Sequence, residues 1–71
     1  MKEQLEKALQ LRSEGQLEVS NQILVDLVQL YPQDALMNYQ CAWSFDVLGR
    51  EREAIPFYEK AVSLGLAERQ E

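Results

Sequence analysis

The side chains that catalysis most often uses are sparse in this sequence. The chain contains no histidine, so it has no imidazole base and no histidine-based metal site. It has no glycine-rich loop to hold a phosphate, and its serines have no base beside them in the sequence that could activate them. The single cysteine, Cys41, cannot form an intramolecular disulfide and has no histidine to activate it, so we expect a small core residue in a reducing environment. We therefore expect no catalysis, no metal and no cofactor.

The charge balance limits the classes of partner. Twelve acidic residues against seven basic residues give a formal net charge of −5. Such a chain repels phosphate backbones and anionic headgroups, so we expect neither nucleic acid nor a membrane surface as its partner. The sequence has no run approaching the roughly 20 apolar residues of a membrane span, and its first residues lack the apolar segment of a signal peptide. These features predict a cytoplasmic protein.

The elements that position any site are helices. Apolar residues recur at spacings of three and four along the chain, and no segment alternates with a period of two. Gly15 and Gly49 are suited to helix ends, because glycine adopts the left-handed conformation at little cost. Pro32 denies a backbone donor to a continuing helix, and Asp34 can cap the helix that follows. We predict an all-α fold with helices at residues 2–13, 16–30, 34–48 and 50–64.

Residues 1–34 match residues 35–68 at a constant offset. The offset of 34 pairs Ala8 with Ala42 and Gly15 with Gly49, and it pairs apolar with apolar residues in both predicted helices of each unit. Such a period is that of the tetratricopeptide repeat. Small residues in these units would allow two helices to cross closely.

The second unit resembles the tetratricopeptide family best. The family pattern of large, small and aromatic positions is filled here by Asn38, Cys41, Ala42, Phe45, Ala54, Tyr58 and Ala61. The segment from Ala42 to Ala61 is also similar to a group of bacterial tetratricopeptide proteins. This resemblance implies one domain over residues 1–71, built as a right-handed α–α superhelix of two antiparallel hairpins. Repeat one would cover residues 1–34 and repeat two residues 35–68, with residues 69–71 as the start of a further helix.

The resemblance also implies a groove lined by the first helix of each hairpin, where family members bind a peptide or a partner helix. Its lining residues would be Leu5, Leu9, Arg12, Leu36, Tyr39, Trp43 and Asp46. Tyr39 and Trp43 would form an aromatic ridge, and large aromatic residues are the usual anchors of recognition. Packing of Trp43 between the two first helices as a core residue remains an equally open interpretation.

The chemistry of this groove favours an apolar partner. Chaperone-binding members of the family hold a C-terminal carboxylate with lysine and asparagine, and the matching positions here are Leu5 and Leu9. We therefore expect a non-catalytic protein–protein interaction module that binds an apolar peptide or helix of a partner protein.

Self-assembly is the competing hypothesis. The predicted fourth helix is apolar on several sides, through Ile55, Phe57, Tyr58, Val62 and Leu64. A third hairpin would normally cover part of that surface, because repeat proteins usually stack three or more units. The alternative functions are therefore a scaffold that forms a homodimer and the N-terminal part of a longer repeat array, and we expect this chain to form a homo-oligomer.

Overall fold

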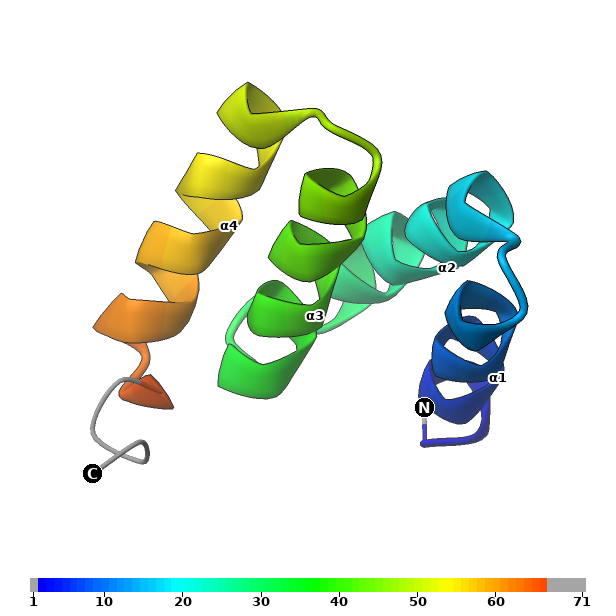
Figure 1. The fold of residues 1–71 in the computed structure, drawn as a ribbon. Helices are drawn as coiled ribbons and strands as arrows, with labels where there is room; N and C mark the ends of the chain where they lie inside the picture. Colours follow the sequence, from blue (N-terminus) through cyan, green and yellow to red (C-terminus); the bar gives the residue numbers. More distant parts are fainter. Residues whose placement is uncertain (1, 67–71) are drawn as a thin grey trace.

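Four helices follow one another along the chain in the computed structural model, which describes residues 2–66 (Figure 1). They are α1 (Lys2–Ser13), α2 (Leu17–Leu30), α3 (Ala35–Val47) and α4 (Glu51–Ser63). The described residues contain no strand, so the all-α prediction is confirmed, and each predicted helix end is confirmed to within one residue. The further helix predicted to start at residues 69–71 lies outside the described residues. None of the described helices is both long enough and apolar enough to span a bilayer.

The turns that join α1 to α2 and α3 to α4 are built by the same hydrogen bonds. In each turn a glycine N–H donates to the carbonyl three residues earlier, and the next N–H donates to the carbonyl five residues before it. The first turn uses Gly15 (φ 87°) and Gln16, at 3.1 and 2.8 Å, and the second uses Gly49 (φ 76°) and Arg50, at 2.9 and 3.0 Å. This pair of bonds is the Schellman motif, which needs a left-handed residue. The predicted role of both glycines is confirmed, and the two turns lie 34 positions apart.

The turn between α2 and α3 is fixed by side chains. The Asp34 carboxylate accepts a hydrogen bond of 2.8 Å from the N–H of Met37, which confirms the predicted cap of α3. The buried Asn38 side chain donates to the carbonyls of Pro32, at 3.2 Å, and of Asp34, at 2.8 Å. These bonds hold the entry to α3 and therefore set the direction in which it leaves α2.

Small residues lie where the two helices of each hairpin cross. Ala8 in α1 and Ser20 in α2 are fully buried, and the Ser20 hydroxyl donates to the Ala8 carbonyl at 2.6 Å. Ala42 and Ala54, at the corresponding positions of the second hairpin, are also buried. A larger side chain at these positions would hold the helices apart.

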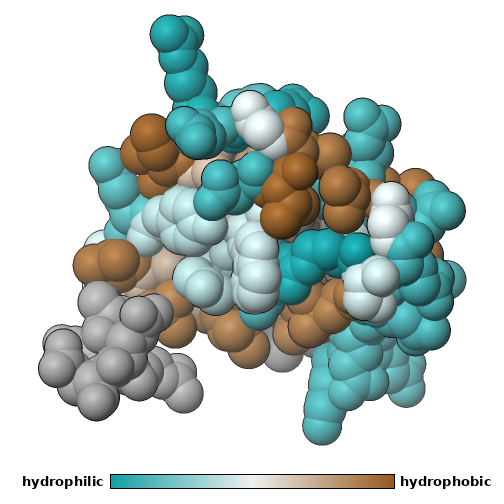
Figure 2. All heavy atoms as spheres, viewed as in Figure 1, coloured by the Kyte–Doolittle hydropathy of each residue, from teal (hydrophilic) through white to brown (hydrophobic). Residues whose placement is uncertain are grey.

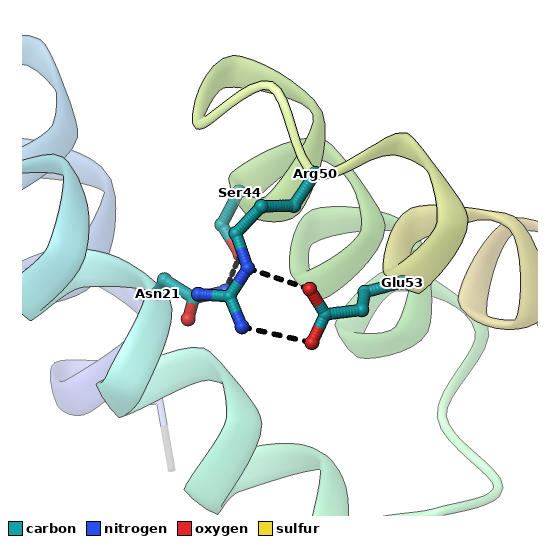
Figure 3. A network of polar contacts seen from close by, with 4 residues as sticks. All are labelled: Asn21, Ser44, Arg50 and Glu53. Carbon is teal, nitrogen blue, oxygen red and sulfur yellow. Dashed lines mark hydrogen bonds and ion pairs between the residues drawn. The ribbon is translucent and has the colours of Figure 1, made fainter.

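The two hairpins meet through α2 and α3. Consecutive helices contact each other, and Figure 1 shows α3 between α1 and α4, with α2 behind it. A buried polar pair lies in this contact: Asn21 of α2 donates from Nδ2 to Oγ of Ser44 in α3 at 2.8 Å (Figure 3). Ser44 in turn donates to the Cys41 carbonyl at 2.6 Å. All three polar groups are therefore satisfied inside the contact.

Figure 3 also shows an ion pair at the surface. Arg50 forms a two-point contact with Glu53, with Nε 2.6 Å from Oε1 and Nη2 2.8 Å from Oε2. The hydrogen bond from Arg50 lowers the pKa of Glu53, and the same bond raises the pKa of Arg50. Both side chains are exposed, so the pair is screened by solvent.

Candidate functional site

Three aromatic rings form a cluster on the face shared by α3 and α4. We call Tyr39, Trp43 and Tyr58 the aromatic cluster. The ring of Tyr39 lies 6.0 Å from that of Trp43 and 5.8 Å from that of Tyr58, measured between centroids, and both pairs are tilted by 59°. Figure 2, in the view of Figure 1, shows pale, weakly polar side chains in the middle of the visible face, with apolar side chains in brown and hydrophilic side chains in teal around them. Tilted contacts at these distances are favourable for aromatic rings.

Arg12 reaches from α1 onto the aromatic cluster. Its guanidinium carbon lies 4.2 Å from the centroid of the Trp43 ring, and its Nη2 donates to Oε1 of Gln40 at 2.9 Å. The other terminal nitrogen, Nη1, is buried without a hydrogen-bond partner among the described residues. Burial lowers the pKa of Arg12, an effect that Tyr39 and Tyr58 partly oppose, and the guanidinium remains charged at neutral pH. Arg12 thus holds Trp43 in place by a cation–π contact.

Tyr58 links α4 to the same face. Its hydroxyl donates to Oδ2 of Asp46 at 3.1 Å. Burial, followed by the hydrogen bond to Asp46, raises the pKa of Tyr58. The face therefore carries a cation held against one ring and a carboxylate held by another.

Among the residues predicted to line the groove, Arg12 and Tyr39 both contact the ring of Trp43, and the seven residues are exposed to different degrees. Leu36 and Trp43 are the most open, with 45% and 41% of their surface exposed, and Asp46 is also exposed. The other members are partly buried: Leu5, Leu9, Arg12 and Tyr39. Trp43 belongs to the surface of the face and not to the buried cluster that contains Cys41. We call these seven residues the groove face.

The residues predicted to form a self-assembly surface on α4 divide into two groups. Ile55 and Val62 are 51% and 55% exposed. Phe57 instead stacks on Phe45 of α3, with centroids 5.7 Å apart and planes 17° from parallel, and Tyr58 turns toward Asp46. Leu64 is partly buried. The outward apolar part of this set is therefore Ile55 and Val62.

Two groups capable of nucleophilic chemistry, the Cys41 thiol and the Ser44 hydroxyl, are held inside the fold. Cys41 is fully buried, as predicted, and burial raises its pKa to about 12, so the thiol is protonated at neutral pH. The Ser44 hydroxyl is committed to the Cys41 carbonyl and to Asn21. Neither group lies on the face of the aromatic cluster, which presents rings and one cation held against Trp43.

Two contacts of this site were not predicted. The placement of Arg12 over Trp43 joins residues of different helices, and the sequence offers no local signal for it. The bond from Tyr58 to Asp46 was hidden by the broad apolar pattern of α4, which left the direction of each ring open.

The comparisons with known proteins give no match: no family model, no curated protein and no solved structure matches this chain. The repeated hairpins and the groove face are therefore the observations on which a functional proposal rests.

Proposed function

We propose that this chain is a non-catalytic interaction module of the tetratricopeptide type, which binds a peptide or helix of a partner protein along the groove face. The observation that carries this proposal is Trp43, which leaves 41% of its surface open while Arg12 and Tyr39 hold its ring. A ring that is already held loses little conformational freedom on binding, so more of its contact energy appears as affinity. Exposed tryptophan is also among the commonest binding hot spots.

The tetratricopeptide assignment is supported by the internal symmetry of the fold. The two Schellman turns at Gly15 and Gly49 use the same hydrogen bonds 34 positions apart. The small residues at the two helix crossings, Ala8 and Ala42, are related by the same offset and are both fully buried. This period is the one that the tetratricopeptide pattern has.

The composition of the groove face favours an apolar partner segment. Leu36 is open beside the aromatic cluster, while Leu5 and Leu9 are partly exposed on α1. The guanidinium of Arg12 lies over Trp43 and donates from Nη2 to Gln40, and its unpaired Nη1 is buried, so neither terminal nitrogen is presented to a terminal carboxylate at the surface. An apolar peptide or helix that covers Trp43 fits this arrangement.

Peptide selection on the immobilised chain tests the proposal. Peptides would be selected from a random library, and their affinities for the purified chain measured by calorimetry. We expect Trp43→Ala to weaken the selected peptides by roughly tenfold or more, as for a hot spot. Val19→Ala is the matched control, because Val19 is half exposed on α2 and lies outside the groove face. Unchanged affinity in a folded Trp43→Ala variant would refute the proposal.

A second candidate function, self-association, is favoured by the exposure of Ile55 and Val62 on α4. Burial of both side chains against a second copy would remove apolar surface from water. Light scattering behind a sizing column measures the mass directly. A mass that stays at one chain across a wide range of concentrations would exclude this candidate.

A further inference from the structure

Helix α2 buries one side against the second hairpin. Asn21, Leu24 and Val28 lie on that side, and all three are buried. Asn21 bonds directly to Ser44 of α3, while Leu24 and Val28 belong to the buried cluster that α3 helps to build. The first hairpin is therefore covered by a helix laid along α2.

The corresponding side of α4 is open. Adding 34 to the three positions gives Ile55, Tyr58 and Val62. Ile55 and Val62 are more than half exposed, and Tyr58 is only partly buried. By contrast Ala54 and Ala61, which correspond to Ser20 and Leu27, are buried just as those residues are. Helices α2 and α4 thus agree at these inner positions and differ at the positions where α3 covers α2.

A hollow marks the uncovered place. It lies between α3 and α4, measures about 220 Å³, and is lined by Asp46, Glu51, Ala54, Ile55 and Tyr58. The corresponding place on the first hairpin lies beside Arg12 and Asn21, where α3 supplies Gln40 and Ser44 as hydrogen-bond partners. Helix α3, which packs on α2, is therefore an example of a helix that covers this side of a hairpin.

We infer that the open side of the second hairpin binds an α-helix of a partner polypeptide, one that carries small and apolar residues on its docking side and a lysine or arginine that reaches Asp46. This site is separate from the groove face along α1 and α3, except that Asp46 lies at the border of both. It goes beyond the proposed function, because it names a second surface and the chemistry of its occupant.

The chemistry required of the covering helix follows from two differences in residue type between equivalent positions of the two hairpins. Ile55 replaces Asn21, so the covering helix needs an apolar residue where α3 has Ser44. Asp46 replaces Arg12, which donates to Gln40, so the covering helix must donate a hydrogen bond where α3 accepts one. A cationic donor suits Asp46 best, since charged hydrogen bonds are the stronger ones and the chain carries a net charge of −5.

Helix α1 of a second copy lacks the apolar residue and the hydrogen-bond donor that this side requires. Subtracting 34 from Gln40, Cys41 and Ser44 gives Glu6, Lys7 and Gln10, all of them exposed and polar. A copy stacked as α3 is stacked would place Glu6 against Asp46 and bury Lys7 where α3 has the fully buried Cys41. Like charges and an unpaired buried cation both oppose that arrangement. A second copy docked through its α1 is therefore not the occupant that this side favours.

The probe is a stapled helical peptide with the sequence of residues 34–48, changed by Gln40→Lys, Cys41→Ala and Ser44→Ala. Its binding to the full chain is measured by fluorescence anisotropy. A peptide with Gln40→Glu in place of lysine tests the charge, and a peptide of residues 2–16 tests the fit of α1. We expect saturable binding of the lysine peptide, weaker binding of the glutamate peptide, and none of the α1 peptide.

Variants of the chain locate the site. We expect Ile55→Glu to weaken the lysine peptide at least about tenfold, because a buried apolar contact is lost and a charge is placed in it. Val19→Glu is the matched control, since Val19 is as exposed as Ile55 and lies on α2, and it should leave binding unchanged. Asp46→Asn should remove the preference for lysine over glutamate.

Three outcomes of these experiments would overturn the inference. The proposed site is refuted if the lysine peptide does not bind, or if it binds equally to the wild-type chain and to Ile55→Glu. Loss of binding in Trp43→Ala but not in Ile55→Glu places the peptide in the groove, which refutes this inference and supports the proposed function. A dimer that Ile55→Glu dissociates identifies a second copy as the occupant.

Discussion

The hydrogen bond between Asn21 and Ser44 joins the two hairpins, and either partner can be removed separately. Ser44→Ala leaves Nδ2 of Asn21 without an acceptor at a position that is 7% exposed. An unsatisfied buried donor costs about 1–3 kcal/mol, so we expect a loss of about 2 kcal/mol of unfolding free energy. Asn21→Ala removes the same bond and some packing, for a loss of about 1–2 kcal/mol. The double variant should lose about 1 kcal/mol less unfolding free energy than the two single losses added together, because each single variant already breaks the same hydrogen bond.

Urea unfolding followed by tryptophan fluorescence measures these losses. Trp43 is the single tryptophan of the chain and lies on α3 against Arg12, so its emission reports the contact between the hairpins. Ser13→Ala is the matched control, because the Ser13 hydroxyl also donates to a carbonyl three residues earlier but is exposed and has no partner in another helix. We expect this control to change stability by less than about 0.5 kcal/mol.

Two results would refute the reasoning. One is additivity of Asn21→Ala and Ser44→Ala to within about 0.3 kcal/mol, which would mean that the pair has no energetic coupling. The other is a loss in Ser44→Ala no larger than that in Ser13→Ala, which would mean that the hydroxyl acts only within its own helix.

Three further predictions follow from the described contacts. Gly49→Ala should lower the unfolding free energy by about 1–2 kcal/mol in the same urea assay, because φ is 76° there, and an unchanged midpoint would contradict this. Cys41 should react with a thiol reagent no faster than the chain opens, since it is buried and its pKa is about 12, and rapid reaction of the folded chain would be inconsistent with its burial. The pKa of Glu53 is lowered by Arg50, so the stabilisation from this pair is present above the unfolded carboxylate pKa and lost as the pH falls through the folded pKa. A carboxyl NMR titration should therefore show the pKa of Glu53 rising in Arg50→Ala, and no change would mean that the pair does not form in solution.

The helices could be predicted from the sequence because their ends are fixed by local chemistry. Gly15 and Gly49 provide the left-handed residue that each hairpin turn needs, and Asp34 provides the cap of α3. These signals act within a few residues of the helix ends, so they can be read without knowledge of the tertiary structure. The common offset of the two glycines likewise predicted that the two turns would be alike.

The contacts of the groove face could not be predicted in the same way. Arg12 and Gln40 are 28 positions apart, and their hydrogen bond depends on how α1 and α3 lie relative to each other and on the Arg12 rotamer. Phe57 and Tyr58 are adjacent on α4, so their side chains point about 100° apart around the helix. The apolar pattern identified both residues but not that Phe57 would stack on Phe45. Tertiary packing, which sequence periodicity does not encode, decides these directions.

The contacts between consecutive helices have a consequence for the speed of folding. Each of α1–α2, α2–α3 and α3–α4 is joined by a short turn, so the chain closes only small loops as these contacts form. Helical proteins with such local contacts fold in times on the order of microseconds to milliseconds. The chain therefore needs little time to find its native helix pairs.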